Sequence, residues 1–89
     1  MKVFNICNNC YQINDGEWIY CQSYSFLVAM YSFKRSKLVL GRKWDYSKTT
    51  LKHLKLFLNR LTPDFENMTK KDILKLLDSG KIEYDDMLD

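Results

Sequence analysis

The first half of the chain alternates between apolar and polar residues, whereas the second half repeats its leucines at helical spacing. Alternating runs occupy residues 2–6, 11–14 and 17–24, and an almost continuous apolar run occupies 26–33. Alternation places successive side chains on opposite faces of a strand, and a short continuous apolar run is typical of a strand buried on both faces. We therefore predict β-hairpins in this half, and the simplest of them pairs 26–33 with 37–41.

The Asp15-Gly16 pair separates the runs 11–14 and 17–24. It suits a two-residue type I′ turn, because both central residues of that turn need a positive φ. Aromatic side chains share one face of the strand 17–24, and Ile19 and Cys21 share the other. Both faces therefore need a cover, which indicates a central strand.

The second half predicts two helices. Leucines recur every three or four positions over residues 51–61, with Phe57 on the same face, which is the spacing of one helical stripe. Ser47 can cap the start of this helix, and Thr62-Pro63 stops it because the residue before proline disfavours the helical region.

The second helix follows Thr69, whose pairing with Asp72 resembles a capping box, and it ends before Gly80. Ile82 and Tyr84 then form a last short strand or simply dock. Strands followed by helices predict an α+β fold, in which a three- to four-stranded antiparallel sheet of N-terminal hairpins packs against two C-terminal helices. We expect one compact domain over residues 1–89, with a frayed acidic tail at 85–89.

Composition supports a folded domain. The chain has 89 residues, of which 46% are hydrophobic, and this is too apolar for disorder and too short for two domains. No apolar run reaches the length of a membrane span, and the first residues lack the apolar region of a signal peptide. The sequence therefore predicts no membrane contact and a cytoplasmic location.

The three cysteines are an odd number, which argues against a closed disulfide framework and favours reduced thiols. Cys7-Asn8-Asn9-Cys10 is a C-x2-C pair that can grip one zinc ion, and Cys21 with His53 would complete three thiolates and one imidazole. A second such pair, which structural zinc sites usually have, is missing from the sequence. The ordinary interpretation is bystander cysteines, so we expect no cofactor.

His53 is the only histidine, and the sequence places no nucleophile or acid near it that would make it a general base. We expect it at the surface or half-buried, in contact with a partner. Phosphate-binding glycine loops, Ser-His-Asp orders and H-E-x-x-H patterns do not occur in the sequence. We therefore expect a protein that is not an enzyme.

Charge is segregated along the chain. Residues 34–55 hold eight basic residues and one acid, whereas residues 64–89 hold eight acids and four lysines. The acidic end suits either a solubilising tail or a mimic that enters a basic groove. The basic region is interleaved with aromatics, and this combination can neutralise phosphates and stack on unpaired bases. The residues that we predict to contact a partner or nucleic acid are Lys34, Arg35, Lys37, Arg42, Lys43, Lys48, Lys52, His53 and Lys55.

Two runs carry a resemblance to a known family. The runs Ser23-Tyr24-Ser25-Phe26-Leu27-Val28-Ala29 and Trp44-Asp45-Tyr46-Ser47-x-Thr49-Thr50-x-x-His53-Leu54-x-x-Phe57-Leu58 resemble a small domain of unknown function that is seen in phage and mobile-element proteins of low-GC bacteria. The resemblance covers roughly residues 17–80, and it does not include the C-x2-C pair. Physically, the second run is a strand-to-helix corner in which Trp44 and Tyr46 share a sheet face.

The resemblance implies a phage-type accessory protein inside a host bacterial cell. We expect the chain to act as a monomer or homodimer. Proteins of that kind often bind and block a host protein or ribonucleoprotein effector, including CRISPR effectors, so an anti-CRISPR inhibitor is the concrete expectation. The alternative is a small nucleic-acid-binding protein that uses the basic and aromatic residues.

Overall fold

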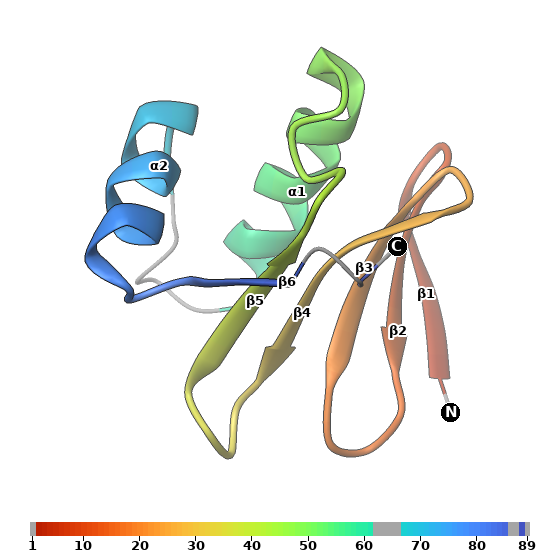
Figure 1. Cartoon of the computed structure of the whole chain (residues 1–89). Coiled ribbons are helices and arrows are strands. Elements are labelled where there is room, and N and C mark those ends of the chain that lie inside the picture. The colour runs from red at the N-terminus through yellow and green to blue at the C-terminus, as the bar shows by residue number, and fades with distance from the viewer. Residues whose placement is uncertain (1, 62–66, 86–87, 89) are drawn as a thin grey trace.

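The fold is α+β, with two helices beside a six-stranded sheet in a computed structural model that describes residues 2–61, 67–85 and 88 (Figure 1). The strands follow the chain order β1-β2-β3-β4-β5-β6 across the sheet. In chain order the elements are β1 (Lys2–Cys7), β2 (Cys10–Asn14), β3 (Ile19–Ser23), β4 (Phe26–Ser32), β5 (Lys37–Gly41), α1 (Lys48–Leu61), α2 (Lys70–Ser79) and β6 (Glu83–Asp85).

The predicted fold class is confirmed, but three to four strands were too few. Strands β1 to β5 form antiparallel neighbours, whereas β6 pairs in parallel with β5 after the two helices. A crossover through helices is what a parallel pair requires. Only three residues of the chain make up β6, so its short pattern could not be separated from a docked segment.

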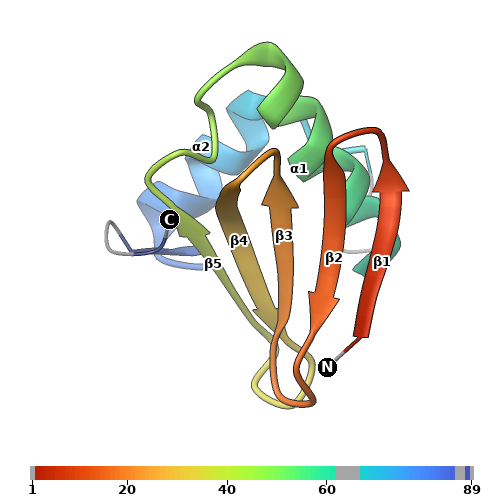
Figure 2. The ribbon, with the colours of Figure 1, turned by 90° about the vertical axis from the view of Figure 1, so that its right-hand side faces the viewer.

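Both helices lie on one side of the sheet, and the opposite face is turned to the viewer in Figure 2. The core lies between α1 and the sheet, where Leu54, Phe57 and Leu58 pack with side chains from β3, β4 and β5. The predicted leucine stripe of this helix is confirmed, although Leu51 and Leu61 are only partly buried at its margins. Helix α2 contributes Ile73, which is fully buried in the same cluster.

The helix ends follow local chemistry that the sequence had predicted. The Ser47 hydroxyl accepts a hydrogen bond from the backbone N–H of Thr50 at 3.1 Å. Thr69 and Asp72 form a reciprocal capping box, and Gly80 ends α2 in the left-handed conformation with φ 82°. The predicted stop at Thr62-Pro63 lies outside the described residues, as does most of the predicted acidic tail.

Two local predictions were wrong. The turn between β2 and β3 is not type I′, because Gly16 has a positive φ of 101° and Asp15 does not. Instead the Asp15 carboxylate holds the turn, since its Oδ1 accepts hydrogen bonds from the N–H groups of Glu17 and Trp18. Trp44 and Tyr46 do not share a sheet face either, because β5 ends at Gly41, before both residues. Trp44 is buried in the core, and Tyr46 is 65% exposed.

Candidate functional site

The tip of the β1–β2 hairpin brings two thiols together. Cys7 and Cys10 face each other across the turn Asn8-Asn9, in which Asn9 has a positive φ of 62°. Asparagine tolerates this backbone region better than most residues do. The pairing register shifts between Asn5 and Cys7, which is a β-bulge. A bulge re-aims the side chains beyond it, and here Cys7 faces α1 instead of the opposite side of the sheet.

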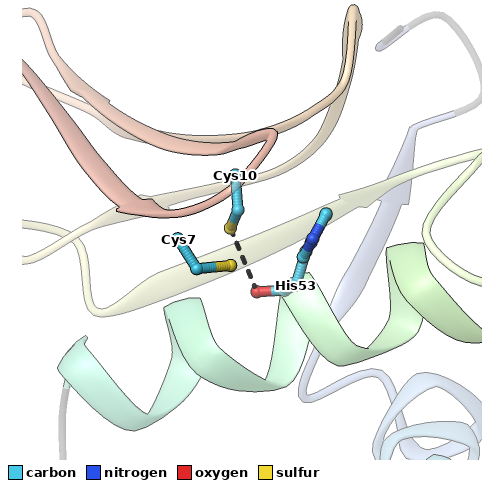
Figure 3. A group of neighbouring side chains, drawn as sticks. All are labelled: Cys7, Cys10 and His53. Atoms are coloured by element: carbon cyan, nitrogen blue, oxygen red, sulfur yellow. Dashed lines mark hydrogen bonds between the residues drawn. The ribbon is translucent and has the colours of Figure 1, made fainter.

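A third thiol and the histidine reach the same place from two other elements. The Sγ atoms of Cys10 and Cys21 lie 3.8 Å and 4.0 Å from the backbone carbonyl oxygen of His53. The ligand atoms of Cys7, Cys10 and His53 all lie within 4.8 Å of one another (Figure 3). We call Cys7, Cys10, Cys21 and His53 the thiol–histidine cluster. The four residues that the sequence offered as a zinc set are therefore neighbours in space.

Hydroxyl groups hold the imidazole of the cluster from the other side. Ser23 Oγ lies 2.7 Å from His53 Nδ1 and 3.3 Å from Thr50 Oγ1, and Ser47 Oγ donates to the same threonine oxygen at 3.2 Å. Ser23 is fully buried and His53 is only 3% exposed. The expectation of a surface or half-buried His53 was wrong, because this residue shares the inward face of α1 with Thr50 and Phe57.

The pKa values of the four groups in the cluster are shifted in different directions. Hydrogen bonding from the Cys21 thiol, with smaller contributions from Cys7 and Arg60, lowers the pKa of Cys10. The pKa of Cys21 is raised by its hydrogen bond to Cys10 and by burial, and the pKa of Cys7 is raised mainly by desolvation. Desolvation, followed by the charge of Lys52, lowers the pKa of His53. Cys10 is therefore the thiol of the cluster whose pKa is lowered, and the lowered pKa of His53 favours the neutral form of its imidazole.

The predicted basic residues do not form one surface. The turn with Lys34, Arg35 and Lys37 lies at one end of the sheet, and the start of α1 lies at the other end in both views (Figures 1 and 2). Arg35 is paired with Glu17 at 3.0 Å and Lys37 with Glu83 at 2.5 Å. Of the basic residues that the structure places elsewhere, Arg42, Lys48 and Lys52 are exposed, whereas Lys43 and Lys55 are partly buried.

Part of the acidic end has structural partners as well. Glu83 pairs with Lys37, and Asp72 belongs to the capping box of α2. The pKa of the Asp72 carboxyl is lowered mainly because the backbone N–H of Thr69 donates a hydrogen bond to it. The acids Asp64, Glu66, Asp86 and Asp89 lie outside the described residues.

The sheet face that points away from the helices carries a row of apolar side chains. The register pairs Val3 with Ile13, Ile13 with Tyr20, Tyr20 with Met30, and Met30 with Val39. Directly paired residues point to the same face, so these five residues form one line across five strands, which we call the apolar row. Val39 is buried, Val3 is 60% exposed, and the other three residues are partly exposed.

A shallow cavity lies beside the apolar row. It has a volume of about 310 Å³ and is lined by Ile13, Asp15, Tyr20 and Leu27. The sequence indicates that both faces of β3 need a cover, but it does not reveal this row. The row depends on the register of five strands, and the alternation within each strand does not reveal that register.

Comparison with known proteins adds a family without a known activity. Neither the curated proteins nor the solved structures contain a match to this chain. In the part of the chain that the structure describes, no helix has the length and apolar character needed to cross a membrane. A family model described as a family of unknown function, DUF8033, matches residues 2–75. Because this match spans most of the sequence, the chain belongs to the DUF8033 family.

Proposed function

We propose that this chain is a non-catalytic accessory protein that binds a host protein through the apolar row and thereby inhibits it. The observation that carries the proposal is the continuous line of apolar side chains on the sheet face opposite the helices. Exposed apolar patches on small proteins commonly mark binding surfaces for other proteins. The cavity beside the row gives a partner side chain a place to insert.

The charges around the row favour a protein partner over a nucleic acid. Arg35 and Lys37 lie at the same end of the sheet as the Asp15 turn, and acidic side chains already pair with both of them. Asp15 itself lines the cavity. Nucleic-acid interfaces are strongly basic, whereas protein interfaces combine an apolar centre with a mixed polar rim.

Two adjacent residues of β1 allow a matched test. Val3 belongs to the row, whereas its neighbour Phe4 pairs with Gln12 and points to the opposite face. Both side chains are largely exposed, at 60% and 47%. We expect the tagged chain to capture a stable protein partner from host lysate, Val3→Glu to lose that partner, and Phe4→Glu to keep it. Absence of any stable protein partner, or equal capture by both variants, would contradict the proposal.

The inhibitory step has its own readout. We propose a CRISPR effector as the host factor, and plaque counts of a targeted phage on a host with active CRISPR immunity test this choice. The wild-type chain is expected to restore plaques, and Val3→Glu is expected to fail. If the chain captured a partner but did not change the plaque number, it would still be a protein-binding protein, but a CRISPR effector would not be its target.

One observation favours nucleic-acid binding as a second candidate. The Lys43 ammonium lies 3.8 Å from the centre of the Phe26 ring and 5.9 Å from that of Tyr46, and Tyr46 is 65% exposed. An exposed ring beside cations is suited to stack on an unpaired base. Gel shifts at low and high salt test this role. Tyr46→Ala should weaken binding, whereas Tyr84→Ala, which removes another exposed ring, should not. No shift at low salt excludes this candidate.

A further inference from the structure

We propose that the thiol–histidine cluster binds one zinc ion, which ties the β1–β2 hairpin and β3 to α1. The ligands would be the Sγ atoms of Cys7, Cys10 and Cys21 and one imidazole nitrogen of His53. Three thiolates and one imidazole are an established donor set for structural zinc. This site lies on the helix-covered face, so the proposal is independent of partner binding through the apolar row.

The distances suit a tetrahedral ion after small side-chain movements. Zinc–sulfur bonds of about 2.3 Å place tetrahedral sulfur ligands about 3.8 Å apart. The ligand atoms of Cys7, Cys10 and His53 are already within 4.8 Å of one another. The thiols of Cys10 and Cys21 lie 3.8 Å and 4.0 Å from the same carbonyl oxygen, that of His53. Rotation about their side-chain bonds can therefore bring in Cys21 as the remaining ligand.

The backbone of the hairpin is shaped to turn both of its thiols inward. Without the β-bulge between Asn5 and Cys7, alternation would place Cys7 on the sheet face of Val3 and Asn5. The bulge costs ladder hydrogen bonds, and its result is that Cys7 faces Cys10 and α1. A cysteine without a binding role would not need a bulge that turns its side chain toward α1. The tight turn with its left-handed Asn9 then keeps the two sulfur atoms on one side.

The donor chemistry selects the class of ion. Sulfur and imidazole ligands favour zinc and similar thiophilic ions over calcium and magnesium, which prefer oxygen ligands. Binding Zn²⁺ through three thiolates releases three protons to solvent and leaves a site with a net charge of about −1. The positive charges of Arg60, near Cys10, and of Lys52, near Cys7, would offset that charge.

An ion at this position has a structural task. Residues Lys2 to Asn5 of β1 are exposed, so this edge strand buries little surface of its own. The cluster lies where the tip of the β1–β2 hairpin meets α1 (Figure 3). Ligands from β1, β2, β3 and α1 would join the weakly packed edge of the sheet to the core.

Cobalt substitution tests the site on the full reduced chain. Co²⁺ added to the metal-free protein should give the intense visible absorption of tetrahedral cobalt and a sulfur-to-cobalt charge-transfer band. One equivalent of Zn²⁺ should remove both signals. The melting temperature should rise with zinc concentration, because a ligand that binds only the folded state stabilises it. A pale octahedral spectrum, or a melting temperature that does not respond to zinc, overturns the proposal.

Cys7→Ser tests the ligand set, because Cys7 is the least buried of the three cysteines and its loss should leave the fold intact. We expect Cys7→Ser to weaken zinc affinity by about tenfold or more and to reduce the charge-transfer band. The control is Asn8→Ala, which changes an exposed residue of the same turn and should bind zinc like the wild type. Equal affinity in Cys7→Ser and Asn8→Ala overturns the proposal.

Discussion

The two faces of the sheet follow the same alternation but differ in what covers them. On the face toward α1, the line of Cys21, Ala29 and Leu40 is fully buried under helical side chains. On the opposite face, the apolar row begins at a valine that is 60% exposed and passes through partly exposed residues. Burial explains the first set of residues. In the second set Val39 is also buried, but the other four residues keep part of their surface exposed, which is why we assign the row to binding.

The largest expected effect lies in the core of the helix-covered face. Phe57 is fully buried between α1 and the sheet. We expect Phe57→Ala to lower the free energy of unfolding by about 3–5 kcal/mol, because it removes a large apolar side chain and leaves a cavity. Chemical denaturation of both proteins measures this loss. If Phe57→Ala lost no more stability than a substitution in the apolar row, the two faces would not differ in their contribution to folding.

A smaller effect distinguishes neighbouring polar residues of β3. Ser23 faces the helix and holds His53 Nδ1, whereas Gln22 faces the other way and donates to the Tyr24 carbonyl oxygen. All buried side-chain nitrogen and oxygen atoms among the described residues have partners. Ser23→Ala should leave the imidazole nitrogen without its partner and cost about 1–3 kcal/mol.

Gln22→Ala serves as the matched control and should cost about 0.5 kcal/mol or less, since water can replace the lost bond. Urea denaturation of the two variants gives the comparison. Equal costs would mean that the Ser23 contact contributes nothing beyond an exposed hydrogen bond.

The smallest effect is the pH dependence of the turn beside the apolar row. The pKa of Asp15 is lowered because the N–H groups of Trp18 and Glu17 and the hydroxyl of Tyr20 donate to its carboxylate. A lowered folded-state pKa adds stability above the unfolded-state pKa, and this stability disappears as the pH falls through the folded-state value. The wild type should therefore be slightly more stable than Asp15→Asn at neutral pH.

In strong acid the stability difference between the wild type and Asp15→Asn should vanish. Unfolding curves of both proteins across acidic and neutral pH measure it, and the comparison removes the titration of other carboxyls. A constant difference at all pH values would show that the Asp15 charge does not stabilise the turn.

The elements of the fold could be predicted, because each depends on a local signal. Leucine spacing and the hydroxyl caps predicted both helices. The apolar run 26–33 predicted β4, the strand that pairs with β5. The parallel strand β6 could not be predicted with certainty, since three residues carry almost no pattern. The C-x2-C pair and His53 were visible as metal ligands in principle, but nothing local indicates that α1 crosses above Cys10 and Cys21.

The errors in the site arise from contacts between distant parts of the chain. His53 lies between lysines in sequence, but it is buried because it lies on the inward face of α1, where Ser23 of β3 offers its Nδ1 a partner. The basic residues were expected to gather by sequence proximity, but β5 carries the chain from one end of the sheet to the other between them. The β-bulge that aims Cys7 inward has no sequence signal in a single chain.

Two isoleucines test the contrast between the faces most directly. Ile19 lies in the helix-covered core at 8% exposure, and Ile13 belongs to the apolar row on the neighbouring strand. The measurement is the free energy of unfolding of Ile19→Ala and Ile13→Ala by chemical denaturation. We predict a loss of about 2–5 kcal/mol for Ile19→Ala and less than about half of that loss for Ile13→Ala. Equal losses, or a larger loss for Ile13→Ala, would show that the apolar row serves the fold and contradict its assignment to a partner.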